Sequence, residues 1–501
     1  MKPDFSRATG LLALAAVTLL GLLEGRAATP NIVYILADDL GYGDLKFLNP
    51  ESRIATPHMD KLAAEGMVFT DAHSTSSVCT PSRYSILTGR YSWRTRLQQG
   101  VPGGFAPPLI DKERLTVPAL LKQQGYATAC IGKWHLGMTF AKKPDASIPI
   151  PDGPVTRGFD RFFGISASLD MPPYAYVRND RWTSPLDMEK ELFKNRPGPA
   201  ASDFEAVNVL PDLTREAVSF IGEQAAAKKP FFLYLPLTSP HTPLAPTKEW
   251  EGKSKLGAYG DFLMQTDATV GQILAALEQG GVAGNTLVIL TSDNGFAPMA
   301  GNRELEKQGH FPSGPYRGYK ADIWEGGHRI PFIARWPGTI RPGTRSGALT
   351  SLGDLMATCA DITGAKLPDT AGEDSISLLP VLRGESGQPA RDSIVHHSNT
   401  GRFAIRQGQW KLNFCPGSGG WANPNDPAAV RQGLPAVQLY DLSTDPGEKE
   451  NLQAEHPEIV TRLTALLEEQ IRNGRSTPGE KQKNDAEIVI HKPIVRSEGQ
   501  K

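Results

Sequence analysis

The chain has 501 residues, 40% of them hydrophobic, which is enough to bury a large core over two or three domains. Its formal net charge is −1, from 53 basic and 54 acidic side chains. This balance excludes a broad electrostatic attraction to nucleic acid or to an anionic membrane, so any recognition of an anion must be local.

The first 28 residues are typical of a secretory signal peptide. Lys2 and Arg7 precede an apolar stretch at 11–23, and small residues follow it. The stretch is shorter than the ~20 apolar residues that a membrane span needs, although a retained anchor is the alternative. We expect an exported protein, periplasmic or secreted, with no stable membrane span after signal cleavage.

Beyond this segment, apolar runs of strand length alternate with amphipathic stretches of helix length. The alternation predicts an α/β domain over residues 29–378, with a large, mostly parallel central sheet flanked by helices. Ligands bind beyond the carboxyl ends of the strands in such sheets. Polar residues that could share one crevice there follow four of the runs: Asp38 and Asp39 after 32–36, Lys133 and His135 after 127–131, His241 after 231–235, and Asp293 and Asn294 after 287–290.

Asp38, Asp39, Asp293 and Asn294 form an all-oxygen ligand set. Such a set suits a hard cation, either Ca²⁺ or Mg²⁺. Both pairs also fit ordinary turns, but their position at strand ends favours metal binding. Within a strand, Asp38 and Asp39 would point to opposite faces, so we expect the following turn to re-aim them.

The pentapeptide Cys-Thr-Pro-Ser-Arg that begins at Cys79 predicts a short helix ending at Gly89. Its proline suits the first helical position, and Thr80 or Ser77 could cap the helix. Cys79 would then lie at the positive end of the helix, where anions bind. Arg83 opposes the helix dipole there, which predicts a carboxylate or a bound anion as its partner.

Lys133, His135, His241 and Lys320 add cations and acid–base groups. Lys133 and His135 lie two residues apart, so in an extended segment they project to the same side. Each of the four alone would more often be structural or solvated. Their joint occurrence favours a site that binds anionic oxygens and moves protons.

The four cysteines are Cys79, Cys130, Cys359 and Cys415. In an exported chain they could form two disulfides. Their wide spacing fits neither a dense disulfide framework nor a zinc motif. We interpret Cys130 and Cys359 as core residues, and the state of Cys415 stays open.

After the α/β domain the pattern changes. Short apolar segments at 403–406 and 410–413 between glycine-rich turns predict antiparallel strands, and the amphipathic run 457–472 predicts a helix. We therefore expect a smaller C-terminal α+β subdomain over residues 379–485 and a loosely held tail at 486–501.

The motif at Cys79, Cys-X-Pro-X-Arg continuing into Leu-Thr-Gly-Arg at 87–90, resembles the signature of the type I, formylglycine-dependent sulfatases of the alkaline phosphatase superfamily. The resemblance is arylsulfatase-like and covers the chain after the predicted signal. Further blocks resemble this family in the same order: 38–39, 132–137, 240–243, 292–295 and 318–320, with non-catalytic blocks at 158–160 and 439–452.

The resemblance implies that Cys79 is oxidised to Cα-formylglycine. The partner would be a formylglycine-generating or sulfatase-maturating enzyme. It also implies a calcium ion held by Asp38, Asp39, Asp293 and Asn294 together with the modified Cys79.

The same resemblance implies a role for each of the other site residues. Arg83 and Lys133 would steady the formylglycine hydrate, and Lys133 with Lys320 would bind the sulfate oxygens. One hydroxyl of the hydrate would attack sulfur while His241, helped by Lys320, protonates the leaving oxygen. His135 would deprotonate the second hydroxyl, which then expels sulfate.

The segment 164–168 departs from the family, because it reads Gly-Ile-Ser-Ala-Ser where arylsulfatases often have Gly-Ile-Pro-Tyr-Ser. We assign the serine role beside the sulfate to Ser168. Asp170 could hydrogen-bond sugar hydroxyls, with nearby tyrosines as apolar faces, although an ordinary surface loop is the alternative. We assign His310 and Arg317 to the rim of the pocket.

We therefore expect a sulfatase that acts on a sulfated carbohydrate or an aryl sulfate. One alternative is a phosphonate or phosphate ester hydrolase of the same superfamily. Another is a catalytically silent protein that binds sulfated glycans, which the complete set of acid–base groups disfavours.

Overall fold

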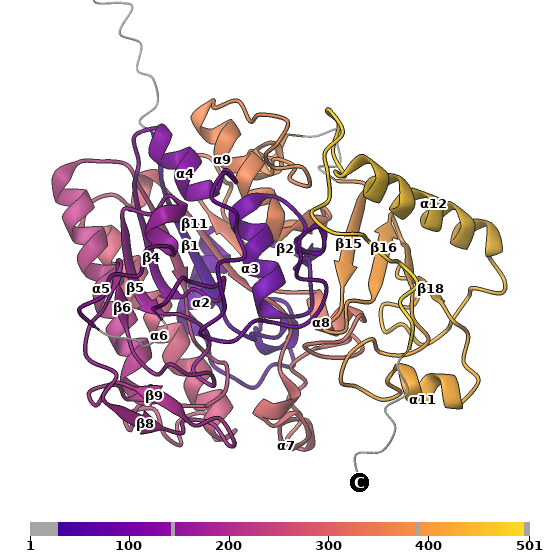
Figure 1. The fold of residues 1–501 in the computed structure, drawn as a ribbon, viewed down its shortest axis with the longest axis horizontal. Coiled ribbons are helices and arrows are strands. Elements are labelled where there is room, and N and C mark those ends of the chain that lie inside the picture. Colours follow the sequence, from indigo (N-terminus) through magenta and orange to yellow (C-terminus); the bar gives the residue numbers. More distant parts are fainter. Residues whose placement is uncertain (1–28, 142–145, 386–390, 495–501) are drawn as a thin grey trace, which may run out of the picture.

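The computed structural model describes residues 29–141, 146–385 and 391–494, so the predicted signal at 1–28 lies outside the described residues. A ten-stranded sheet forms the centre of the molecule (Figure 1). Four parallel neighbours lie in its middle: β11 (Thr286–Ser292), β1 (Asn31–Ala37), β10 (Phe231–Pro236) and β4 (Ala127–Lys133). They contain the four apolar runs noted in the sequence, so the predicted parallel sheet is confirmed.

Every residue of these four strands is buried, as expected for strands that are covered on both faces. The other strands extend the sheet at both edges: β5 (Arg161–Ile165), β6 (Val177–Arg178) and β7 (Arg181–Trp182) beside β4, and β12 (Phe332–Arg335), β2 (Met67–Phe69) and β13 (Thr344–Ser346) beside β11. The pairings of β5 with β6, β6 with β7, β11 with β12 and β12 with β2 are antiparallel, so the sheet is mixed at its edges.

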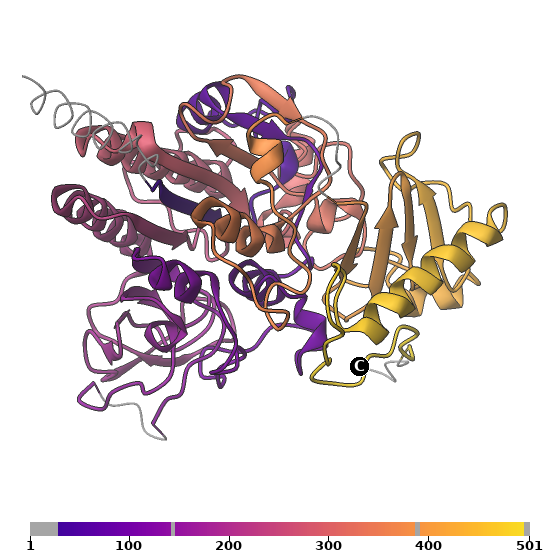
Figure 2. The ribbon, with the colours of Figure 1, turned by 90° about the horizontal axis from the view of Figure 1, so that it is seen from above.

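Helices form a layer on each face of this sheet (Figure 2). One layer contains α2 (Pro57–Glu65), α5 (Ala206–Ala227) and α6 (Ala258–Gln279), and the other contains α3 (Cys79–Thr88), α4 (Val117–Gln123) and α9 (Leu355–Thr363). Shorter elements complete this part of the chain: helices α7 (Asn302–Lys307), α8 (Glu325–His328) and α10 (Leu379–Leu382), and the strand pairs β3 (Ala72–His73) with β14 (Thr350–Ser351) and β8 (Met188–Lys190) with β9 (Gly198–Ala200).

The C-terminal region forms a separate antiparallel sheet beside the main body (Figure 1). Its strands are β15 (Ser393–His397), β16 (Phe403–Gln407), β17 (Trp410–Asn413) and β18 (Gln438–Asp441), with α11 (Asp426–Arg431) between the last two. Helix α12 (Pro457–Asn473) covers this sheet and buries Leu463 and Leu467 against it. The predicted antiparallel strands and the amphipathic helix are confirmed.

The predicted tail differs from expectation up to residue 494, the last one described. Ile488 and Ile490 pack against the C-terminal core, and Lys492 Nζ donates to Gln98 O at 2.9 Å. The apolar side chains explain the difference, because they bury surface that a purely polar tail would leave in water. No helix within the described residues is long and apolar enough to cross a bilayer.

All four cysteines are buried free thiols. Cys130 and Cys359 belong to the main apolar core, as predicted. Cys415 lies in a small cluster under the C-terminal sheet, where its Sγ donates to Gly417 O at 3.3 Å. The open question about Cys415 is thereby answered, since it forms no disulfide here.

Candidate active site

The polar residues that follow the four central strands lie together at one edge of the sheet. Because the strands are parallel, their carboxyl ends face the same side. Hydrogen bonds from Asp38 N to Ser239 O (2.9 Å) and from Asp293 N to Ala37 O (3.2 Å) continue the strand pairing into the loops. We call the buried group that results the strand-end cluster: Asp38, Asp39, Arg83, Lys133, His241, Asp293, Asn294 and Lys320.

The backbone at Asp39 turns its carboxylate into this cluster. Its φ is 67°, in the left-handed region that non-glycine residues seldom adopt, so the turn re-aims the side chain as predicted. Asp39 Oδ1 accepts from Asn294 Nδ2 at 2.7 Å, and Asp39 N donates to Asp293 Oδ1 at 3.3 Å. The two acidic pairs, 255 residues apart at Asp39 and Asn294, are therefore in direct contact.

The oxygens of the acidic pairs fit a hard cation. Within the described residues, Asp38 Oδ1 and Asn294 Oδ1 are buried without a hydrogen-bond partner. Asp38, Asp39 and His241 also each offer a ligand atom within 4.8 Å of the others. Buried acceptors without a donor are costly, and a metal ion would satisfy them. The donor set that the sequence predicted is thus compatible with Ca²⁺ or Mg²⁺.

Cys79 is the first residue of α3, and the helix ends at Gly89, whose φ is 63°. The predicted end at Gly89 is confirmed. The predicted side-chain cap is wrong: Val78 is the N-cap, and the Thr80 hydroxyl instead donates to His135 O at 2.9 Å. Burial raises the pKa of the Cys79 thiol, although Lys133 and Lys320 oppose the shift. An unmodified thiol here is a weak nucleophile, because little of it is thiolate.

Arg83 lies one turn further along α3 and is fully buried. Its Nε and Nη2 donate to Asp293 Oδ2 at 2.9 and 2.7 Å, and its Nη1 donates to Lys133 O at 3.0 Å. The carboxylate partner that the helix dipole predicted is therefore Asp293. Burial works against the charge of Arg83, but Asp293 and Asp38 outweigh it and raise its pKa.

The two lysines of the cluster each face one carboxylate. Lys133 Nζ donates to Asp38 Oδ2 at 2.8 Å and to Ser168 Oγ at 3.3 Å, and Lys320 Nζ lies 2.7 Å from Asp39 Oδ1. Burial opposes ionisation of Asp38, but Lys133, His241 and Arg83 outweigh it and hold its pKa well below its usual range.

His241 completes this side of the cluster. Its Nε2 lies 3.5 Å from Asp39 Oδ2, and its Nδ1 contacts Thr242 O and lies 3.4 Å from Ser168 Oγ. A proton on Nδ1 would therefore be held by a backbone carbonyl, which leaves Nε2 as the nitrogen that faces the carboxylates. Ser168, to which we assigned the serine role although the preceding Pro and Tyr of the family pattern are absent, contacts both Lys133 and His241.

The backbone conformation at His135 differs from the predicted extended one. Its φ is 56°, so the segment after Lys133 is not extended and the predicted same-side projection does not hold. Its Nε2 donates to Pro102 O at 3.0 Å, and its Nδ1 has no partner within the described residues. Burial, aided by Lys133 and Arg83, holds the pKa of His135 well below its usual value. The result is a neutral imidazole with a free Nδ1 lone pair.

Of the three other predicted substrate-binding residues, Asp170 has a buried polar atom without a hydrogen-bond partner among the described residues. Its Oδ2 pairs with Arg196 Nη1, and its buried Oδ1 has no partner in the described part of the chain. His310 Nε2 donates to Asp44 Oδ1 at 2.8 Å, and Arg317 Nη1 donates to Glu448 O at 2.7 Å. His310 and Arg317 therefore lie in structural contacts outside the strand-end cluster.

The tyrosines expected to offer apolar faces to a sugar are used in packing. Tyr174 is buried and donates to Arg196 O, and Tyr176 stacks on Phe163 and donates to Asp212 Oδ2 at 2.8 Å. Sequence reasoning missed Arg196, because a lone arginine on a polar loop carries no signal of its partner. The ion pair between Arg196 and Asp170 becomes visible only in the folded structure.

The chain matches the family described as Sulfatase over residues 30–365 and the one described as C-terminal region of aryl-sulfatase over 389–498. An N-acetylgalactosamine-6-O-sulfatase of Bacteroides thetaiotaomicron is 35% identical over 487 residues, which cover 88% of this chain and 92% of that protein. Arylsulfatase A of Homo sapiens is 36% identical over 485 residues, which cover 91% and 89%.

Solved structures agree with these matches. A structure from Bacteroides thetaiotaomicron, described with its metabolism of multiple glycosaminoglycans, has a TM-score of 0.79 at 33% identity and covers 88% of this chain and 99% of that one. A phosphonate monoester hydrolase of Agrobacterium radiobacter has a TM-score of 0.57 at 19% identity, covering 88% and 94%. The second likeness concerns the fold alone.

Proposed function

This chain belongs to the sulfatase family and hydrolyses sulfate esters, and we propose that its natural substrate is a sulfated amino-sugar glycan, cleaved with a formylglycine made from Cys79 and a bound calcium ion. The observation that carries the proposal is the position of Cys79 at the start of α3, beside three buried cations and acceptor oxygens that lack donors. A neutral thiol there forms no ion pair with these groups, while an anionic ester would pair with the cations.

Asp38, Asp39, Asp293, Asn294 and residue 79 would hold the metal, which supplies positive charge for the oxygens of the reacting centre. Magnesium is the alternative ion for this donor set. A maturation enzyme with its own oxidant would convert the Cys79 side chain to the aldehyde, whose hydrate supplies two hydroxyl groups for attack at sulfur and for release of sulfate.

Lys133 and Lys320 would bind the non-bridging sulfate oxygens. Each holds a carboxylate within 2.9 Å, so its position is fixed before the substrate arrives. Ser168 links Lys133 to His241 and can donate to the same sulfate. The guanidinium of Arg83, held by Asp293, carries its charge one turn beyond Cys79 on α3 and would steady the modified residue.

His241 is the proposed proton donor to the leaving oxygen. Its Nδ1 side is engaged by Thr242 O, so the Nε2 proton of an imidazolium is the one available for transfer. His135 is the proposed base of the second step, since its neutral ring has a free Nδ1 and its backbone is tied to Thr80, next to Cys79.

The amino-sugar part of the proposal is supported by the names of the relatives and by Asp170. Asp170 lies two residues after Ser168, and its free Oδ1 can accept a hydrogen bond from a sugar hydroxyl. Export through the segment 1–28, to a periplasmic or extracellular location where such glycans occur, is part of the same proposal.

The test is to express the protein with a maturation enzyme and to combine mass spectrometry of the Cys79 peptide with turnover assays. We expect the aldehyde at residue 79, hydrolysis of an aryl sulfate far above that of the matching aryl phosphate, and hydrolysis of N-acetylgalactosamine 6-sulfate within a panel of monosaccharide sulfates. A residue 79 that stays a thiol in active protein would refute the nucleophile. A phosphate preference would transfer the assignment to the phosphate and phosphonate ester hydrolases.

The metal has a separate readout. Ca²⁺ at about 100 times its dissociation constant should stabilise the fold by about 2.7 kcal/mol, and Asp293→Asn should abolish the shift in melting temperature. Equal shifts in both proteins would place the ion elsewhere.

A further inference from the structure

We propose that Ser292 is a positioning residue for the metal, because its hydroxyl group ties together the two loops that carry the oxygen ligands. The role rests on the proposed function and goes beyond it, since Ser292 is not one of the proposed ligands. Ser292 is the last residue of β11 and pairs in register with Ala37, the last residue of β1. Asp293 and Asp38 follow these two residues directly, so both ligand loops begin at this pair.

The Ser292 hydroxyl bonds both loops at once. Its oxygen accepts from Leu40 N at 2.9 Å, and its proton is donated to Asn294 O at 2.8 Å. Leu40 directly follows the ligand Asp39, and Asn294 is the amide ligand of the second loop. All three residues that share these bonds are 0% exposed, so solvent does not compete for either bond.

The bond to Leu40 N supports the unusual backbone of Asp39. The left-handed conformation at Asp39 turns its carboxylate into the cluster and brings the next amide, Leu40 N, within hydrogen-bond distance of Ser292. The Leu40 side chain belongs to the main apolar core, so this amide cannot reach solvent by a small movement. Without the Ser292 oxygen it would be a buried donor that lacks this acceptor, and the strained turn would gain by relaxing.

Other contacts between the two loops use the proposed ligands themselves. Asn294 Nδ2 donates to Asp39 Oδ1 at 2.7 Å, and Asp39 N donates to Asp293 Oδ1 at 3.3 Å. A metal ion would compete for these side-chain oxygens, whereas the two bonds of Ser292 use none of them. Partners of this kind, which hold the ligands from behind, typically change metal affinity by roughly 10–100-fold when they are removed.

The experiment measures Ca²⁺ binding to the full-length, metal-free protein by calorimetry and by the shift in melting temperature, with turnover of an aryl sulfate as a third readout. Ser292→Ala removes the hydroxyl group, and Ser292→Thr keeps it. The matched control is Thr291→Val. Thr291 is the preceding, equally buried residue of β11, on the opposite face of the strand, and its hydroxyl donates to Pro331 O at 2.7 Å.

Ser292→Ala should weaken Ca²⁺ binding by roughly 10–100-fold, and its turnover should recover toward the wild-type value as the Ca²⁺ concentration is raised. Ser292→Thr should retain most of the affinity. Thr291→Val also loses a buried hydrogen bond, so its melting temperature should fall, but its Ca²⁺ affinity should equal that of the wild type.

An unchanged Ca²⁺ affinity in Ser292→Ala would overturn the positioning role, and so would an equal loss of affinity in Thr291→Val, which would indicate a general loosening of β11. Both results leave the proposed function standing. A wild type that binds neither Ca²⁺ nor Mg²⁺ would instead refute the metal of the proposed function, and the role of Ser292 with it.

Discussion

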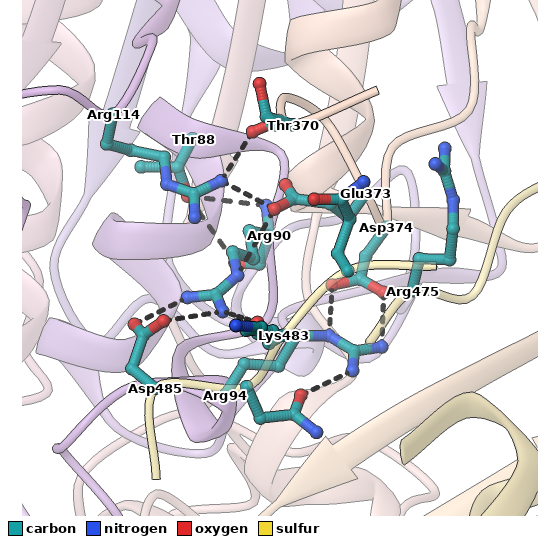
Figure 3. Close-up of polar contacts among 12 residues, drawn as sticks. Thr88, Arg90, Arg94, Arg114, Thr370, Glu373, Asp374, Arg475, Lys483 and Asp485 are labelled. Carbon is teal, nitrogen blue, oxygen red and sulfur yellow. Dashed lines mark hydrogen bonds and ion pairs between the residues drawn. The ribbon is translucent and has the colours of Figure 1, made fainter. Parts of the chain in front are cut away.

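Helix α3 joins two ionic clusters of different character, the first buried and the second partly exposed at Asp485. At its start, Arg83 belongs to the strand-end cluster. Just beyond its end, Arg90 belongs to a second group, which we call the arginine network: Arg90, Arg94, Arg114, Glu373, Asp374 and Asp485 (Figure 3). Both contain three cations and three carboxylates, so a count of charges does not distinguish them.

The arginine network connects parts of the chain that are distant in sequence. Arg90 donates to Asp485 from Nη1 and Nη2, at 2.8 and 3.0 Å, and Arg94 donates to both oxygens of Asp374 from Nε and Nη2, at 2.9 and 2.8 Å (Figure 3). Arg114 pairs with Glu373 at 2.6 Å. Planar guanidinium groups that match carboxylates in this manner fix position and cannot transfer protons at ordinary pH. The network thus fastens the C-terminal segment to the helix that begins at Cys79.

The strand-end cluster combines its charges with side chains of a different kind. It contains two lysines and a histidine, which can exchange partners or protons, and only one arginine. Non-glycine residues with left-handed backbone, Asp39, His135 and Ala321, lie in or beside it, and none of the six network residues has such a conformation. Backbone strain of this kind costs about 1–3 kcal/mol per residue and is retained where function requires it. The comparison teaches that the side-chain types and the backbone conformations of the two clusters, rather than their numbers of charges, distinguish the proposed reactive site from a structural network.

The largest effect is expected from a substitution at the start of α3, in the residue beside the strand-end cluster. Cys79→Ala should lower kcat/KM on an aryl sulfate by at least about 10⁴-fold, because the residue is the proposed source of the nucleophile. The melting temperature should change little, since the side chain is small and makes no ion pair of its own. Activity assays beside thermal unfolding separate the two effects. Unfolding of the variant would argue for a purely structural cysteine.

The opposite pattern is expected in the arginine network. Asp374→Ala leaves Arg94 buried without its carboxylate and should lower the free energy of unfolding by about 3–5 kcal/mol. The turnover of the remaining folded enzyme should be close to wild type. The control is Asp361→Ala, an exposed position on α9, where the change should stay within about 0.5 kcal/mol. A variant with full stability and impaired turnover would show that the network takes part in catalysis.

A smaller and more selective loss is expected at His241. His241→Ala should reduce kcat about 100-fold for a sugar sulfate and less than tenfold for an activated aryl sulfate, because only the poor leaving group needs a proton. Steady-state kinetics on both esters measure the difference. Equal losses on the two substrates would contradict the acid role and leave His241 as a binding residue.

The sequence predicted most of the strand-end cluster because its signals are local. Each group follows an apolar run, and the geometry of a parallel sheet then brings the strand ends together. This reasoning placed Asp38 near Asp293 and Lys133 without any contact information. It failed at His135, because no sequence pattern predicts that a residue other than glycine will adopt a left-handed backbone conformation.

The arginine network lay beyond such reasoning. The partner of Arg90 is 395 positions away, in a segment that composition marked as the edge of a loosely held tail. The contact of His310 could not be predicted either. Its partner Asp44 lies in a turn 266 residues earlier, and neither segment contains a sequence signal for the pairing. Long-range side-chain pairing depends on how loops pack, and hydrophobic patterning does not specify it.

The smallest expected effect concerns His397, a neutral ring buried at the end of β15 and close enough to Lys492 to feel its charge. Burial, with the charge of Lys492, lowers its pKa to about 3, below the ~6.5 of an unfolded histidine. The unfolded chain therefore binds a proton first as the pH falls, so stability is complete above pH ~6.5 and is lost progressively toward pH ~3. Between pH 6.5 and 5 this group contributes up to about 2 kcal/mol of that loss. His397→Gln should flatten the decline in urea unfolding experiments at the two pH values, with the other buried histidines unchanged in both proteins; an equally steep decline in the variant would show that His397 does not titrate in this range.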